Sequence, residues 1–146
     1  MPQLSLIVIV GLLGGIAIGL QAPLSSIINQ RLGVFESVFI VHLGGIIVVA
    51  IPLIMLGGGK LGLWQTVPWY ALCAGALGVV VVSSTVYLVP RIGVAGAITL
   101  IIAGQLTIAA TIDHFGALGV EMRGFNTQRL LGLGVVMLGV WQTLRS

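Results

Sequence analysis

The sequence has 146 residues, of which 58% are hydrophobic and 6% are charged, whereas about 25% charged residues is usual for a soluble domain. A chain of this composition cannot cover a surface that faces water, which excludes a soluble enzyme or a soluble binding domain. The formal net charge of +3 comes from Lys and Arg residues spread singly along the chain, so no basic patch is present to bind nucleic acid.

Five apolar stretches are candidates for crossing the bilayer, whose hydrocarbon core of roughly 30 Å takes about 20 residues of helix. We predict membrane-spanning helices over residues 4–28, 35–56, 69–89, 94–112 and 129–144. The fold class is therefore an all-α integral membrane protein. Residues 1–146 form a single domain of five transmembrane helices surrounded by lipid.

Polar and glycine-rich segments separate the predicted spans. Residues 29–33 suit a helix end followed by a turn, and residues 57–60 are mostly glycine, which disfavours a helix. Residues 90–93 predict a tight connection, and residues 115–128, which hold glycines and charges without a steady period, predict the longest loop.

Glycines at intervals of four are typical of close contact between helices inside lipid. Gly11, Gly15 and Gly19 have this spacing on the first predicted span. With 22 glycines in the chain, the spacing alone is a weak signal, and it predicts only that the helices are tightly packed.

The sequence contains no pattern that indicates enzymatic chemistry. Cys73 is the only cysteine, so neither a disulfide nor a cysteine-based metal site can form within one chain. His42 and His114 lie on different predicted elements, with no triad or metal-ligand spacing between them. We predict neither an enzyme nor a bound metal or cofactor.

Polar side chains within the predicted spans are the candidates for binding a solute, because such residues are costly in lipid and often functional. Gln105 lies near the middle of the span over residues 94–112, where its amide can donate and accept hydrogen bonds. Gln21 and Asn29 share one helical face with Ser25. We predict that this face lies opposite the face that carries Gln105 and Asp113.

Three further polar positions and one histidine each allow two interpretations. Ser83 and Ser84 add hydroxyls to the second half of the span over residues 69–89, where a hydroxyl either binds a solute or bonds back to its own helix. Glu36 is either a favourable charge in the first turn of a helix or a site for a proton or cation. His42 either titrates near neutral pH or makes a hydrogen bond between helices.

The basic residues are divided evenly between the two sides of the membrane that the five spans define. One side holds Lys60, Arg123 and Arg129, and the other holds Arg31, Arg91 and Arg145. An excess of Lys and Arg normally marks the cytoplasmic side. The even division predicts that the chain inserts in both orientations and forms an antiparallel homodimer, unless the terminal amine or a boundary charge sets one orientation.

Five short motifs occur in an order that resembles a known family. They are Asn29-Gln30-Arg31-Leu32-Gly33, Leu88-Val89-Pro90-Arg91-Ile92-Gly93, Ala103-Gly104-Gln105-Leu106, Asp113-His114-Phe115-Gly116 and Arg129-Leu130-Leu131-Gly132. Through the order and spacing of these motifs, nearly the whole chain resembles the YdcZ-like inner-membrane exporters of the drug/metabolite transporter superfamily.

The resemblance implies a five-helix unit in a bacterial inner membrane that works as a pair of inverted units, similar in plan to the small multidrug resistance transporters. Those transporters are expected to carry a glutamate near the middle of the first span, whereas residues 12–20 of this chain hold no acid. This departure argues against proton-coupled export of lipophilic cations. The family's substrates are poorly defined, so the resemblance names no ligand.

Two functions fit these observations. The first is a secondary transporter that exports a small solute by alternating access, as an antiparallel pair or with an oppositely oriented homologue. The second is a membrane scaffold or accessory subunit that does not transport. A transporter should keep polar side chains at membrane depth, whereas a scaffold can dispense with them.

Overall fold

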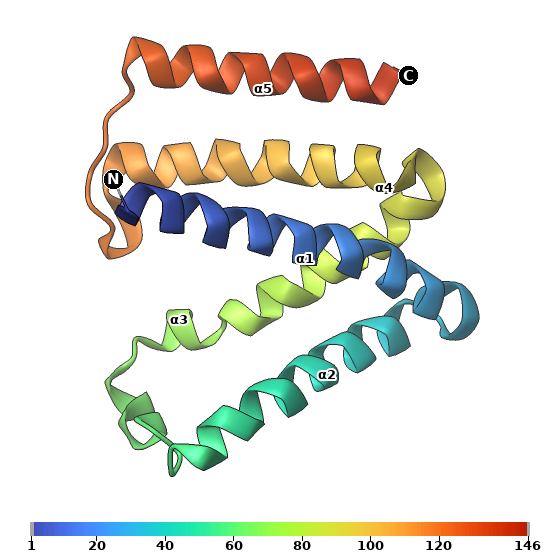
Figure 1. The fold of residues 1–146 in the computed structure, drawn as a ribbon, viewed down its shortest axis with the longest axis vertical. Helices are drawn as coiled ribbons and strands as arrows, with labels where there is room; N and C mark the ends of the chain where they lie inside the picture. The colour runs from blue at the N-terminus through green and yellow to red at the C-terminus, as the bar shows by residue number, and fades with distance from the viewer. Residues whose placement is uncertain (1, 146) are drawn as a thin grey trace. The chain divides into compact units, whose positions relative to one another are not determined.

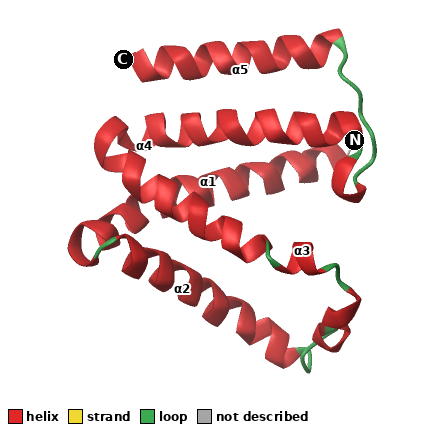
Figure 2. Cartoon of the chain, turned by 180° about the vertical axis from the view of Figure 1, so that it is seen from behind, coloured by secondary structure: helices red, strands yellow, loops and turns green. Residues whose placement is uncertain are grey.

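The computed structural model describes residues 2–145, and within them the regular structure is entirely helical (Figures 1 and 2). The longer helices are α1 (Pro2–Leu32), α2 (Val34–Met55), α4 (Ala74–Phe115) and α5 (Thr127–Arg145). The short elements are the 3-10 turns η1 (Leu61–Thr66) and η2 (Ala117–Gly119) and the single-turn helix α3 (Trp69–Leu72).

The chain divides into two compact units, one up to Pro90 and the other from Arg91 onward. The boundary falls within α4, close to Gly93, whose φ of 73° and ψ of 170° are not helical. Pro90, which has no N–H to donate, lies one turn earlier. Helix α4 is therefore two helices that meet at a kink, at the place where the sequence predicts a connection.

Three helical stretches are long and apolar enough to cross a membrane among the residues described: Leu4–Leu32, Val34–Met55 and Trp69–Phe115. The third has 47 residues, more than twice the roughly 20 that one crossing needs, and contains the kink at Gly93. Helix α5 has 19 residues, with Arg129 and Arg145 near its ends, and is not among the three.

The connection between α1 and α2 is shorter than the sequence predicts. Residues 29–32 continue α1 as its last turn, and the reversal is confined to Gly33, which has a φ of 113°. The Gly33 N–H donates to the Asn29 carbonyl oxygen at 2.9 Å, and the Gly33 carbonyl oxygen accepts from the Ser37 N–H at 3.1 Å. A single glycine can make this reversal because a positive φ costs glycine little free energy.

The first unit is built around this turn. Helices α1 and α2 form a hairpin, and α2 lies beside the first half of α4 in both views (Figures 1 and 2). The buried side chains are small, namely Ala22, Ser25, Ser26, Ser37, Val38, Val82 and Val86. The buried Ser37 hydroxyl donates to the Ser25 carbonyl oxygen at 2.8 Å, which ties α2 to α1.

The second unit contains the rest of α4, a loop with η2, and α5. Helix α5 runs antiparallel to the second half of α4 (Figure 1). The loop turns at Gly116 and Gly119, both with positive φ, and at Leu118, whose φ of 59° is unusual for a residue with a side chain.

Large apolar side chains point outward over most of the chain. Phe35 is 85% exposed, Met55 82% and Ile54 76%. In water this arrangement would leave far more apolar surface than a soluble monomer tolerates. In a bilayer these side chains are solvated by lipid, and helices associate through small residues instead.

None of the three glycines at intervals of four on α1 has a neighbour. An added Cβ at Gly11, Gly15 or Gly19 would meet nothing within 4 Å. Within the first unit, the close approach that their spacing predicts therefore does not occur at this face.

We expect Gly33→Ala to destabilise the protein by about 1–3 kcal/mol, the usual cost of a side chain held in a sparsely populated backbone region. The new Cβ would also lie 2.6 Å from Oε2 of Glu36. Thermal unfolding in detergent measures the loss. The matched control is Gly44→Ala in α2, where nothing lies within 4 Å and alanine suits a helix better than glycine. Equal melting temperatures for the two variants would contradict the assignment of strain to Gly33.

Candidate functional site

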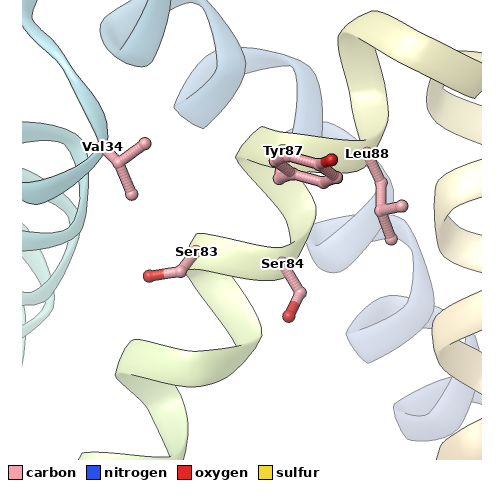
Figure 3. A pocket seen from close by; sticks show the side chains of 5 residues that line it. All are labelled: Val34, Ser83, Ser84, Tyr87 and Leu88. Carbon is pink, nitrogen blue, oxygen red and sulfur yellow. The ribbon is translucent and has the colours of Figure 1, made fainter.

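A pocket of about 430 Å³ opens in the first unit between the start of α2 and the first half of α4. It is lined by Val34, Ser83, Ser84, Tyr87 and Leu88. Figure 3 shows the Ser83 side chain directed toward the α2 segment that carries Val34. The lining is mostly apolar, and its polar side-chain groups are the hydroxyls of Ser83, Ser84 and Tyr87.

Ser83 and Ser84 are the two serines of the pocket lining. Neither makes a hydrogen bond to any described residue, although both side chains are half-buried. Thr85, the next residue, behaves differently, because its hydroxyl donates to the Val81 carbonyl oxygen of its own helix at 2.8 Å. Of the two interpretations that the sequence allows, back-bonding applies to Thr85 and not to the two serines.

Asn29 lies beside the same part of α4. Its side-chain amide donates to the Val86 carbonyl oxygen at 3.4 Å, three residues beyond Ser83. This bond holds α1 against α4 and satisfies a carbonyl within a helix. The contact makes Asn29 a structural neighbour of the pocket.

Glu36 lies in the first turn of α2, where a negative charge is favoured by the helix dipole. Its carboxylate folds back over Gly33, the position where a side chain would collide with Oε2. Glu36 is exposed and follows Val34 of the pocket by two residues. The position of Glu36 agrees with the interpretation that its charge interacts favourably with the helix dipole of α2.

Neither of the two predicted glutamines is among the residues that line the pocket. Gln21 is exposed on α1, more than two turns before Asn29. Gln105 is exposed on the second half of α4, in the other unit. The predicted opposition of the Gln21 and Gln105 faces stays a prediction. Within the first unit, the structure brings together Asn29, Ser83 and Ser84.

An ion pair in the second unit holds the loop between α4 and α5. The Asp113 carboxylate accepts from the Arg129 guanidinium, and each side chain is 32% exposed. Arg129 also donates to the Arg123 carbonyl oxygen at 2.8 Å, and the Arg123 N–H donates to the Asp113 carbonyl oxygen at 2.7 Å. Sequence reasoning placed Asp113 on a solute-facing helix face and missed this pair. The available signal was one acid and one base on either side of the longest loop.

Aromatic contacts complete the same loop. His114 stacks on Phe125 with 4.6 Å between ring centroids, and Nδ1 of His114 accepts from the Phe125 N–H at 3.3 Å. The Asn126 side chain accepts from the Arg129 N–H at 2.8 Å, which caps the start of α5. Both contacts join His114, in the last turn of α4, to Phe125 of the loop, so His114 has a structural role here.

The comparison with protein families decides the class of the protein. A family model described as "Putative inner membrane exporter, YdcZ" matches residues 6–142. The chain belongs to this family. The predicted membership and the location in the inner membrane are thereby confirmed, and the family is a class of exporters, not of enzymes. No curated protein and no solved structure matches the chain.

Four of the five motifs that carry the resemblance lie next to a turn, the kink or the loop of the exporter, whereas residues 103–106 lie within the second half of α4. Residues 29–33 form the last turn of α1 and the reversal at Gly33. Residues 88–93 contain the kink of α4. Asp113 and Arg129, from two further motifs, form the ion pair across the loop.

We expect Asp113→Asn to lower the free energy of unfolding by about 1–3 kcal/mol, the range for losing a hydrogen bond to a charged group that is partly buried. The control is Glu121→Gln, which removes the pair between Glu121 and Arg123, whose side chains are 79% and 68% exposed. An exposed pair is worth about 0–1 kcal/mol. Thermal unfolding and protease cleavage of the loop report the difference, and equal effects of the two variants would show that the Asp113 pair does not hold the loop.

Proposed function

We propose that the protein exports a small solute that binds at the pocket of Ser83 and Ser84. The observation that carries this proposal is the pair of half-buried hydroxyls without a hydrogen-bond partner among the described residues. A polar group left unpaired in an apolar environment costs free energy. A hydroxyl that faces a pocket can recover this cost when a solute supplies the partner.

The lining favours a particular class of solute. Val34, Tyr87 and Leu88 contribute mainly apolar surface, and no charged side chain lines the pocket. The pocket therefore suits a small, mostly apolar molecule with one or two hydrogen-bonding groups. A lipophilic cation would find no carboxylate in this lining, which agrees with the absence of an acid from residues 12–20.

In the proposed assembly, each chain crosses the membrane five times and pairs with an inverted copy. The kink at Gly93 gives two helices from α4, and α5 supplies the fifth. The three-against-three division of Lys and Arg supports insertion in both orientations. Two inverted units can expose a binding site to the two sides of the membrane in turn, which is alternating access. Gln105, Gln21 and Glu36 remain predicted contributors to the solute pathway.

We expect Ser83→Ala and Ser84→Ala each to weaken solute binding by about 2- to 10-fold, the equivalent of one hydrogen bond worth roughly 0.5–1.5 kcal/mol. A library of small solutes is first screened by thermal shift on the purified protein. The compound that stabilises it most is then titrated into each variant and tested for flux in liposomes. Thr85→Val is the control, because the Thr85 hydroxyl already bonds to Val81. If the serine variants bind as the wild type does, the solute site lies elsewhere.

We expect a cysteine at position 60 to be labelled from both sides of the membrane. Lys60 is exposed beyond the end of α2, and the variant is Lys60→Cys in a Cys73→Ser background, which removes the only native cysteine. An impermeant maleimide applied to intact cells should label one fraction, and the remainder should react only after the membrane is permeabilised. Labelling confined to one side would exclude the antiparallel homodimer and favour an oppositely oriented homologue as the partner.

A further inference from the structure

His42 is an ionisable side chain well inside α2 and is half-buried. It follows Val34, the first residue of α2, by eight residues, which is about 12 Å along a helix axis at 1.5 Å per residue. Because α2 is long and apolar enough to cross a membrane, this depth places the imidazole well below the membrane surface. An ionisable group at such a depth is costly, and residues of this kind are often functional.

One ring nitrogen of His42 is fixed by its own helix. Nδ1 lies 2.8 Å from the Val38 carbonyl oxygen. A carbonyl oxygen only accepts, so Nδ1 carries the hydrogen and donates it. In the neutral ring the other nitrogen, Nε2, then has a lone pair and acts as an acceptor. The sequence also allowed a hydrogen bond between helices, but the bond from Nδ1 to Val38 lies within α2.

Nε2 of His42 is directed at Gly78 on α4. A Cβ built on Gly78 would lie 2.8 Å from Nε2, closer than side-chain carbons approach such an atom. A side chain at position 78 would therefore force the imidazole to shift from this position. Nε2 has no hydrogen-bond partner among the described residues, and it is not sealed off, since no fully buried unpaired side-chain nitrogen or oxygen occurs among them.

We propose that Nε2 of His42 is a proton-binding site that couples solute export to the proton gradient. Histidine gains and loses a proton near neutral pH. A proton from water on one side adds to the Nε2 lone pair and gives an imidazolium, while the Nδ1–H bond to Val38 is kept. Release of the same proton to the other side restores the neutral ring, so each cycle moves one proton. The coupling role rests on the proposed export function.

The charges around His42 are sparse. Helix α2 carries one other ionisable residue, Glu36, six residues away or about 9 Å along the axis. The first half of α4 carries Tyr87, nine residues or about 13 Å beyond Gly78. In α1 the ionisable residue is Arg31, in its last turn. Lys60, Tyr70 and Cys73 lie in the segment between α2 and α4.

This sparse charge has a consequence for coupling. The imidazolium has no carboxylate partner within the neighbouring helical turns of α2, so, apart from the Val38 carbonyl oxygen at Nδ1, the charge is stabilised by water or by a polar group of the solute. A proton site with this property changes its occupancy with the hydration of the pathway. Changes in hydration accompany alternating access.

The experiment measures charge moved by proton binding, without any solute. The dimer in liposomes is adsorbed on a solid-supported membrane and exposed to a jump from about pH 8 to about pH 5, the range over which histidine changes charge. A proton that enters the membrane field to reach Nε2 gives a transient current. We expect this current in the wild type and its loss in His42→Gln. His114→Gln is the matched control, because His114, the other histidine of the chain, lies in the last turn of α4, where it contacts the loop, and its loss should leave the current intact.

A second variant tests the proposal independently, in case His42→Gln does not fold. Gly78→Ala keeps the imidazole but places a methyl group against Nε2, and we expect it to reduce the current at unchanged protein yield. A current of wild-type size in either a folded His42→Gln or a folded Gly78→Ala protein would overturn the proposal. Because no solute is present, these results do not depend on the solute site, and failure of the Ser83 and Ser84 variants to affect binding would leave the current unchanged.

Discussion

Within hydrocarbon, every backbone N–H and C=O must find its partner inside the protein, and a helix is the way a single segment meets this requirement. The long apolar stretches accordingly stay helical except at a few residues. Gly33 and Gly93 interrupt the helices with positive φ values of 113° and 73°, and Gly116 ends α4 with a φ of 60°. Each is a single glycine, so the number of backbone groups released from helical bonding is kept small.

The same constraint determines what the interior is made of. Helices in lipid gain little from burying apolar side chains, so they associate through small residues and hydrogen bonds. Ala22, Ser25, Ser37 and Val86 are among the most buried residues of the first unit, while Phe35 and Met55 face outward. The hydroxyl of Ser37 and the amide of Asn29 then bond carbonyl oxygens of neighbouring helices.

The membrane class, the family and most helix positions follow from the sequence, because long apolar stretches and glycine breaks are local signals. The predicted span over residues 35–56 and α2 (Val34–Met55) differ by one residue at each end. The contacts between segments are not local, and the sequence did not show them. Nothing in the spacing of Asp113 and Arg129 says that the loop folds back to join them. The free hydroxyls of Ser83 and Ser84, beside the satisfied hydroxyl of Thr85, follow from rotamers that a pattern of residue types does not encode.

The polar side chains of the helices fall into two groups: those that have a hydrogen-bond partner within the chain, and those that do not. Asn29, Ser37, Asp113 and Arg129 all have partners within the protein, and their bonds join helices or hold a loop. Ser83, Ser84 and Nε2 of His42 have none among the described residues, and all three lie where α2 faces the first half of α4. A polar group without a hydrogen-bond partner in lipid lowers the stability of the protein. In the proposed export cycle these groups find their partners outside the chain: a solute for the hydroxyls and a proton for the imidazole.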